Sequence, residues 1–167
     1  SLSKRDFKRI SDPLKKFGAK FKLRNSKNLP LIIYGNKNLN PIKFLENKGS
    51  AQVKSAVIFG GMRANGTTYI KANKSRNHSE LLSKYLKLPI YVKSKKKYDL
   101  IKIKKVNNIK NFNYHIPSDI SSSAFFIVLT LISNNSKLTI KNVNINPSRT
   151  GIITILKKMG ANIKLKK

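Results

Sequence analysis

The 167-residue sequence has no cysteine and no tryptophan, and it has only six acidic residues and two histidines. The absence of cysteine excludes disulfide bonds and thiolate metal sites, and it is typical of a cytoplasmic protein. A zinc site built on His78 and His115 would need carboxylate ligands that the chain scarcely contains, so we expect no metal site. Apolar runs stay below the ~18 residues that cross a bilayer, so we also expect no membrane-spanning segment.

Basic residues, in contrast, are abundant, and the 36 lysines and arginines give the chain a net charge of +30. One interpretation is nucleic-acid binding, since basic side chains release counterions from phosphate backbones. The other is compositional drift, because the excess is almost all lysine and accompanies many Asn and Ile residues, whose codons are also A/T-rich. The lysines are scattered and do not alternate with aromatic residues as a stacking platform requires, so we favour drift over a nucleic-acid partner. The densest run, residues 93–105, predicts a solvated hairpin.

An internal repeat organises the chain, with one unit recurring at 4–23, 75–92 and 148–165. Each copy contains an amphipathic helix, a break made of small residues or proline, and a short strand. Gly18 and Gly160 stand at two of the breaks, where a left-handed residue closes a helix. The period is roughly 72 residues, which suits a unit of several secondary-structure elements.

A second helix is predicted within each period, at 50–62 and at 118–133. Both segments begin with small hydroxyl residues that can cap a helix, and both are apolar on nearly all sides, so we expect both helices to be buried. The strands that we predict between the helices are 20–24, 30–34, 67–73, 90–93, 99–106, 112–116 and 137–143. The pattern therefore predicts an α/β fold with two helices in each repeated unit.

Five short motifs then resemble the middle of the 5-enolpyruvylshikimate-3-phosphate synthase family, in the family's order and along essentially the whole chain. They are SLSKR, GSAQVKSA, SRNHSE, IPSDISSSAFF and NPSRTGIITILKKMGA, and the SAQVKSA form resembles the bacterial branch. The resemblance implies an inside-out α/β barrel built from repeated two-helix strand units, with parts of two globular domains. Residues 1–117 would belong to the shikimate-3-phosphate-binding domain, and residues 118–167 would begin the return into the second domain.

The resemblance implies transfer of the enolpyruvyl group of phosphoenolpyruvate to the 5-hydroxyl of shikimate 3-phosphate, with release of phosphate. The family reaction passes through a tetrahedral addition intermediate and uses no metal or organic cofactor. Such chemistry requires clamps for anions, a proton donor and a base. The expected partners are therefore the two substrates and the remainder of the same polypeptide.

Two motifs carry the implied shikimate 3-phosphate site, namely Ser50, Ala51 and Gln52, and the pair Ser75 and Arg76. A helix start offers free amides to an anion, Ser50 can donate its hydroxyl to the phosphate, and Gln52 offers both a donor and an acceptor. From the residues alone we would favour Ser50 as a helix cap beside an incidental glutamine, and the resemblance is what favours the substrate role.

Arginine is scarce here, with six arginines against thirty lysines, and Arg5, Arg76 and Arg149 recur at one place in the repeat. This recurrence suggests a need for the planar, bidentate guanidinium group. By resemblance Arg5 contacts phosphoenolpyruvate together with Gln52, whereas Arg149 is interpreted as a packing residue.

Three residues depart from the family pattern: Asp6, Asn77 and Ser118. Asp6 either pairs with the preceding arginine or caps the following helix. These departures leave open a degenerate family member without activity. We interpret His78 as a helix-surface or capping residue, and Asp119 as a cap and hinge residue.

Several functional groups of the family have no counterpart in these 167 residues. They are an early Lys-Ser pair, a Gly-rich loop, the Asp that acts as base and a Lys-Glu pair near the reacting centre. The chain also starts within a motif and shows no secretory signal pattern. We therefore expect the central part of a longer enzyme, with no catalytic residue of its own and little or no activity in isolation. The related transferase that acts on a UDP-sugar shares the fold, but the SAQVKSA and SRNHSE motifs argue against it.

Overall fold

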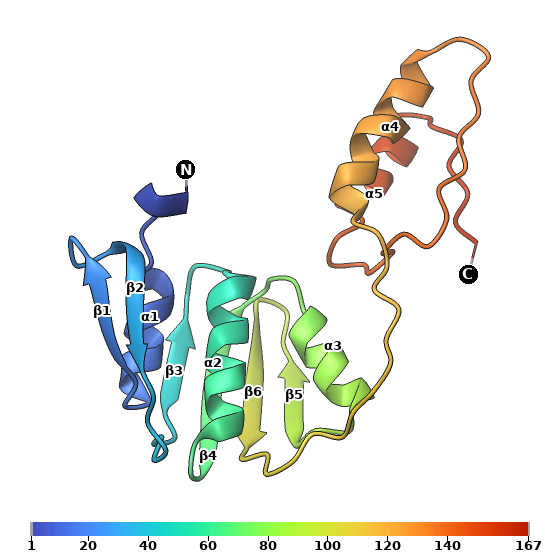
Figure 1. The fold of residues 1–167 in the computed structure, drawn as a ribbon. Coiled ribbons are helices and arrows are strands. Elements are labelled where there is room, and N and C mark those ends of the chain that lie inside the picture. The colour runs from blue at the N-terminus through green and yellow to red at the C-terminus, as the bar shows by residue number, and fades with distance from the viewer. Residues whose placement is uncertain (1, 167) are drawn as a thin grey trace. The chain divides into compact units, whose positions relative to one another are not determined.

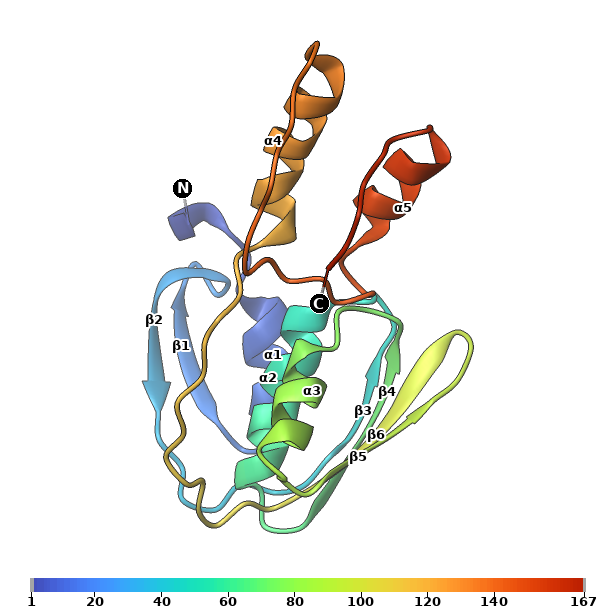
Figure 2. The same cartoon turned by 90° about the vertical axis from the view of Figure 1, so that its right-hand side faces the viewer.

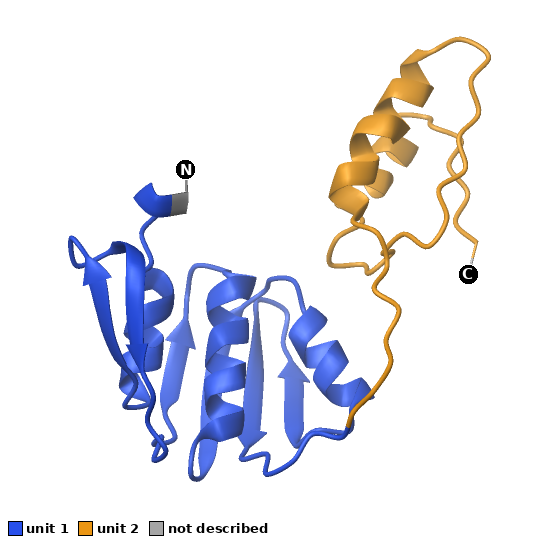
Figure 3. Cartoon of the chain, viewed as in Figure 1, with its two compact units in different colours: residues 1–110 blue, residues 111–167 orange. Residues whose placement is uncertain are grey.

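The computed structural model describes residues 2–166, and the chain divides into two compact units, 1–110 and 111–167 (Figures 1 and 3). This division falls seven residues before the predicted domain boundary at 117/118, and the assignment of the two parts to the two domains of the family stays a prediction. None of the helices within residues 2–166 is long and apolar enough to cross a membrane.

Unit 1 contains two sheets and three α-helices. A short 3-10 turn, η1, covers Leu2–Lys4. The helices are α1 (Lys8–Lys16), α2 (Ala51–Arg63) and α3 (His78–Tyr85). The strands are β1 (Lys20–Arg24), β2 (Asn28–Tyr34), β3 (Lys43–Glu46), β4 (Thr67–Asn73), β5 (Ile90–Ser94) and β6 (Tyr98–Lys104). Strands β1 and β2 form an antiparallel pair, and the second sheet has the order β3-β4-β6-β5, in which only β3 and β4 run parallel.

Helix α2 packs on β3, β4 and β6 and α3 packs on β5, whereas α1 lies between α2 and strand β1 of the two-stranded sheet (Figures 1 and 2). The sequence of β4 explains this placement, since Thr68, Ile70 and Ala72 face inward and alternate with exposed residues. The apolar side packs against Val57 and Ile58 of α2, and the other side is solvated. The alternation therefore positions α2 as the central buried helix of unit 1.

Close packing at the end of α1 joins it to α2. Phe17 is 1% exposed, and a Cβ atom added at Gly60 of α2 would lie 2.9 Å from Cε2 of the phenylalanine ring. Glycine at position 60 is thus what lets α2 approach this ring. Gly18 follows with φ +100° and closes α1, and Gly160 has φ +92°, as predicted for both breaks.

Unit 2 contains α4 (Ile120–Ile132) and α5 (Gly151–Lys158), joined by irregular chain. The strand predicted at 112–116 is wrong, and that at 137–143 reduces to a single parallel bridge between Ser118 and Val143. A strand needs a neighbouring strand to satisfy its amides and carbonyls, and the described part of this unit provides none.

The predicted burial of the helix at 118–133 is also wrong within the described residues. Phe125 and Phe126 are 79% and 62% exposed, and in α4 only Ile120 and Ser123 are buried. Unit 2 holds one other helix and no sheet, so most of the apolar surface of α4 has nothing to pack against. The hairpin predicted at 93–105 is confirmed by the antiparallel pairing of β5 with β6, but its predicted solvation is wrong for one face of β6, where Asp99, Ile101 and Ile103 are buried.

Candidate functional site

Two helices of unit 1 begin at the same edge of the four-stranded sheet. Strands β3 and β4 run parallel, and each leads through a short loop into a helix, α2 after β3 and α3 after β4. Their carboxyl ends therefore meet at one edge, and so do the two helix N-termini. Side chains join them there, because Ser55 Oγ of α2 lies 2.6 Å from Ser79 Oγ of α3. The sheet topology thus brings the two predicted substrate motifs together.

Ser50 is the N-cap of α2, and its Oγ accepts a hydrogen bond from the Val53 amide at 3.4 Å. Ala51 and Gln52 follow as the first two residues of the helix, and Gln52 is exposed. The capping part of the prediction for Ser50 is therefore confirmed. Its role toward a ligand stays a prediction, as do those of Ala51 and Gln52.

Arg9 is a residue that the sequence interpretation missed. It lies in the first turn of α1, and its Nη2 donates to Ser50 Oγ at 3.0 Å and to Gln52 Oε1 at 2.7 Å. The guanidinium group thus joins the start of α1 to the start of α2. The scarcity of arginine could have indicated Arg9. Arg9 lies outside the position that recurs in the repeat, however, so the sequence pattern did not predict a role for it.

The second predicted pair stands immediately before α3. The Ser75 Oγ atom is buried and has no hydrogen-bond partner among the described residues. Arg76 is exposed, and its side chain makes no hydrogen bond or ion pair with the part of the chain that the structure describes. Arg76 is therefore available to a ligand at this edge, and the buried Ser75 hydroxyl is left without a protein partner beside it. His78, the first residue of α3, is exposed, which confirms its interpretation as a helix-surface residue.

Arg5 lies in the segment between η1 and α1, and its side chain is exposed. Its carbonyl oxygen accepts a hydrogen bond from Asn28 Nδ2 at 3.1 Å, which fixes the backbone here. The neighbouring Asp6 accepts from the Lys8 amide at 2.8 Å through Oδ1 and so satisfies the first amide of α1, although the N-cap position itself is held by Phe7. Contact of Arg5 with phosphoenolpyruvate stays a prediction.

A buried ion pair supports the two helix starts. Lys54 Nζ of α2 lies 2.6 Å from Glu80 Oε1 of α3, and the two side chains are 0% and 5% exposed. The carboxylate oxygens have no hydrogen-bond partner among the described residues, so the attraction is that of opposite charges in a dry interior.

Asp99 of β6 anchors the loop that precedes α3. Its Oδ1 accepts from Lys74 Nζ and from Ser94 Oγ, both at 2.5 Å. Burial alone would raise the pKa of Asp99. The hydrogen bonds from Lys74 and Ser94, with the charges of Lys74 and Lys54, outweigh burial and hold this pKa below its ordinary value. The residue directly before Ser75 is thereby tied to the sheet.

Unit 2 contains a similar bridge at the start of α4. Arg149 Nη2 donates to Asp119 Oδ1 and to Ser121 Oγ, both at 2.5 Å. Asp119 is the N-cap, as predicted, and it accepts from the Ser121 amide. This backbone hydrogen bond and the charge of Arg149 keep the pKa of Asp119 below its ordinary value. Arg149 therefore fastens a helix start within its own unit, in line with a structural role.

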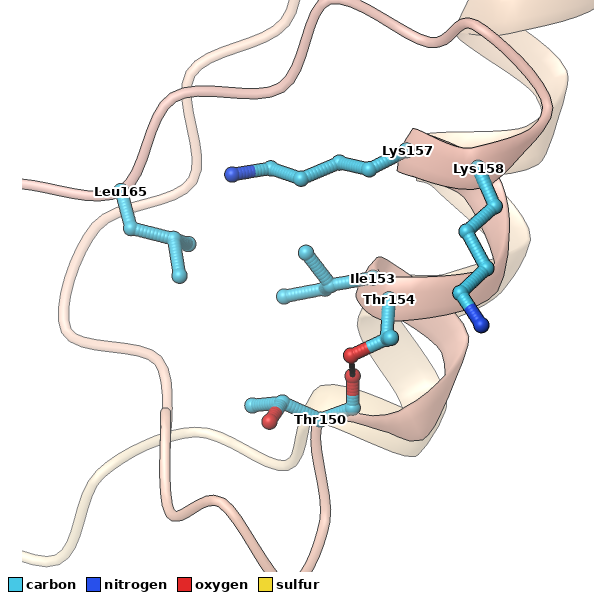
Figure 4. Close-up of a pocket in the computed structure, with 6 residues that line it drawn as sticks. All are labelled: Thr150, Ile153, Thr154, Lys157, Lys158 and Leu165. Carbon is cyan, nitrogen blue, oxygen red and sulfur yellow. Dashed lines mark hydrogen bonds between the residues drawn. The ribbon is translucent and has the colours of Figure 1, made fainter.

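Unit 2 also has a hollow of about 400 Å³ beside α5 (Figure 4). The residues that line it are Thr150, Ile153, Thr154, Lys157, Lys158 and Leu165. The hollow includes none of the predicted site residues, and it brings no acidic or histidine side chain to the two lysines. It does not alter the assignment of the candidate site to unit 1.

Free helix amides, hydroxyl groups and arginines at one sheet edge are typical of α/β proteins that handle anionic ligands. The comparison with known sequences gives the particular family. Residues 1–167 match the family described as EPSP synthase (3-phosphoshikimate 1-carboxyvinyltransferase). The chain belongs to this family, and its fold is part of the inside-out α/β barrel that the sequence led us to expect.

Similar proteins agree with this assignment. The chain is 42% identical over 167 residues to the 3-phosphoshikimate 1-carboxyvinyltransferase of Petrotoga mobilis, and 45% identical over 168 residues to that of Caldicellulosiruptor bescii. A solved EPSP synthase from Acinetobacter baumannii has 34% identity and a TM-score of 0.82. These matches cover 99–100% of the chain but only 37–38% of each relative, so the chain spans little more than a third of their length.

Proposed function

We propose that this chain supplies the shikimate 3-phosphate side of the active site in an enolpyruvyl transferase. The complete enzyme would move the enolpyruvyl group of phosphoenolpyruvate to the 5-hydroxyl of shikimate 3-phosphate and release phosphate, in the cytoplasm and without a cofactor. The observation that carries the proposal is the meeting of the 50–52 and 75–76 motifs at one sheet edge, beside the first turn of α1.

Each residue has a defined task in binding the sugar phosphate. The phosphate lies over the start of α2, where free amides and the positive end of the helix dipole attract it. Ser50 and Ser75 donate their hydroxyl groups to it, and Arg76 supplies a bidentate positive charge. Gln52 contacts the hydroxylated ring and the reacting carboxylate substrate, toward which Arg5 also extends.

Catalysis needs further groups, which we assign to the segments that the relatives have in addition to this third of their length. The chain itself binds and orients shikimate 3-phosphate and contributes Arg5 and Gln52 to phosphoenolpyruvate, and we assign no acid or base of the reaction to its described residues. Orientation is nonetheless a large part of such catalysis, because a fixed geometry replaces a bimolecular encounter.

Nucleic-acid binding is the second candidate function, favoured by the net charge of +30. The two candidates differ in their dependence on salt. Binding of a polyanionic backbone weakens steeply as salt rises, whereas a sugar phosphate held by a few directed groups responds much less.

A calorimetric titration of the chain with shikimate 3-phosphate at physiological salt tests the proposal. We expect saturable binding that weakens about tenfold or more in Arg76→Ala, because a charge-assisted contact is lost. Arg24→Ala is the matched control, since it removes the same charge from an exposed position on β1. A folded chain that ignores shikimate 3-phosphate and binds duplex DNA in a salt-sensitive manner would contradict the proposal and favour the second function.

A further inference from the structure

Arg9 contacts the only glutamine of the chain, and that glutamine belongs to the candidate site. A guanidinium group has five donors and no acceptor, so the group of Gln52 that faces Arg9 must be the carboxamide oxygen. The carboxamide nitrogen, with its two protons, is then directed away from Arg9. A glutamine without such a partner could present either end of its amide to a ligand.

The same arginine limits what Ser50 can do. Ser50 Oγ accepts from Arg9 Nη2 at 3.0 Å and from the Val53 amide at 3.4 Å. A hydroxyl oxygen has two acceptor lone pairs, and these two hydrogen bonds use both of them. The hydroxyl proton remains, so Ser50 can meet a ligand only as a donor.

The bridge in unit 2 shows what distinguishes Arg9. Arg149 spans the N-cap and the second residue of α4, just as Arg9 spans Ser50 and the second residue of α2. In unit 2 one of the two acceptors is the carboxylate of Asp119, so the charges cancel. In unit 1 both acceptors are neutral, and no acidic side chain among the described residues pairs with Arg9 at the positive end of α2. A cation at a helix N-terminus is unfavourable unless an anion is near.

We propose that Arg9 is a positioning residue that determines which groups of Ser50 and Gln52 face a ligand as hydrogen-bond donors. By engaging both lone pairs of Ser50 together with the Val53 amide, and by holding the carboxamide oxygen of Gln52 toward itself, it leaves the Ser50 proton and the Gln52 amide nitrogen as the groups that can face a ligand. Every side-chain group offered at the start of α2 then suits a phosphate, which only accepts, or the acceptor oxygens of a sugar ring. This inference rests on the proposed function and adds a residue that none of the motif assignments includes.

The single glutamine makes a direct experiment available. Selective 15N labelling of the glutamine side chain gives one NH₂ group in the NMR spectrum, and this signal reports on Gln52 alone. The variant Arg9→Met loses both the positive charge and the planar guanidinium group. The variant Arg9→Lys keeps the charge but loses the guanidinium group that can donate to Ser50 and Gln52 together. Arg63→Met is the matched control, because Arg63 is exposed at the opposite end of the same helix. Circular dichroism verifies that each variant is folded.

We expect an ordered Gln52 side-chain signal in the parent and in Arg63→Met, and a mobile one in both Arg9 variants. Shikimate 3-phosphate affinity, measured by calorimetry, should fall about tenfold or more in both Arg9 variants and stay unchanged in Arg63→Met. Loss of affinity in Arg9→Lys distinguishes orientation from charge, because the lysine keeps the positive charge.

Two results would overturn the inference: a Gln52 signal that is equally ordered without Arg9, or full affinity in Arg9→Lys with loss in Arg9→Met. The first result would show that the orientation of the Gln52 amide does not depend on Arg9. The second would show that Arg9 affects the affinity for shikimate 3-phosphate through its charge alone. A parent chain that fails to bind shikimate 3-phosphate while its Gln52 signal still depends on Arg9 would refute the proposed function and, with it, the ligand part of this inference. The orientation of the amide would then stand.

Discussion

Lys54 of α2 and Glu80 of α3 meet at 2.6 Å in the interior of unit 1, with side chains that are 0% and 5% exposed. Each residue lies in the first or second turn of a helix that begins at the candidate site. The pair therefore fastens the two helix starts that carry the predicted substrate motifs. Removal of two charges from water is costly, so the pair is stable only while both partners are present.

The Lys54–Glu80 pair predicts a large effect of a single neutral substitution. Glu80→Gln leaves the lysine charge buried without a counterion, and we expect a loss of about 3–5 kcal/mol in the free energy of unfolding. Urea denaturation measures the loss, and the double variant Lys54→Met with Glu80→Leu should recover most of it. Asp12→Asn is the control, because Asp12 and Lys15 form an exposed pair at 3.7 Å whose loss should cost under about 0.5 kcal/mol. Equal effects in Glu80→Gln and Asp12→Asn would contradict the prediction.

Asp99 predicts a dependence of stability on pH. The pKa of Asp99 is lowered in the folded chain relative to its ordinary value of 3.8. Its ionised form therefore stabilises the fold fully above that ordinary value, and this contribution is lost as pH falls through the folded pKa. We expect thermal denaturation between pH 7 and pH 2 to show a steeper acid loss in the parent than in Asp99→Asn. Parallel curves for the two proteins would refute the assignment.

Ser75 offers a test that separates binding from stability. Its Oγ is buried and has no protein partner among the described residues, so Ser75→Ala removes no hydrogen bond and should change the unfolding free energy by under about 0.5 kcal/mol. If the hydroxyl donates to the sugar phosphate, the same variant should bind shikimate 3-phosphate about tenfold more weakly. Calorimetry and urea denaturation of one sample give both values. Unchanged affinity would remove Ser75 from the proposed site.

The contact between Gly60 and Phe17 predicts that α2 has no room at position 60 for a side chain even as small as a methyl group. In Gly60→Ala the new Cβ would meet the ring at 2.9 Å, so α1 must shift, and we expect destabilisation by about 1–3 kcal/mol. Gly35→Ala is the control, because nothing lies within 4 Å of the added atom, and its stability should be unchanged or slightly higher. A stabilised Gly60→Ala protein would show that the two helices are not packed this closely.

The sequence by itself determined the features that depend on neighbours along the chain. Ser50 as a helix cap, Gly18 and Gly160 as helix ends and the hairpin around residues 93–105 all follow from a few adjacent residues. Backbone geometry and capping act over one turn of chain, so a local pattern is sufficient to predict them. The five family motifs likewise identified the family without any coordinates.

Tertiary structure decided the features that join distant segments. The sequence pattern did not predict β3, because a four-residue strand has too little alternation to be recognised and is defined by its pairing with β4. The segments 112–116 and 137–143 have strand-like composition but no adjacent strand in the described chain, so they form none. The exposure of α4 has a similar cause, since burial depends on which other elements are there to cover a helix.

Arg9 is the clearest case of a site residue that the sequence alone did not reveal. It lies 43 residues from Gln52 along the chain, and only the packing of α1 against α2 brings its guanidinium group to the amide oxygen. Composition and spacing record which groups a chain carries, and they fix the geometry within one helical turn or one hairpin. Hydrogen bonds between helices depend on how whole elements pack, and that is settled only when the core forms.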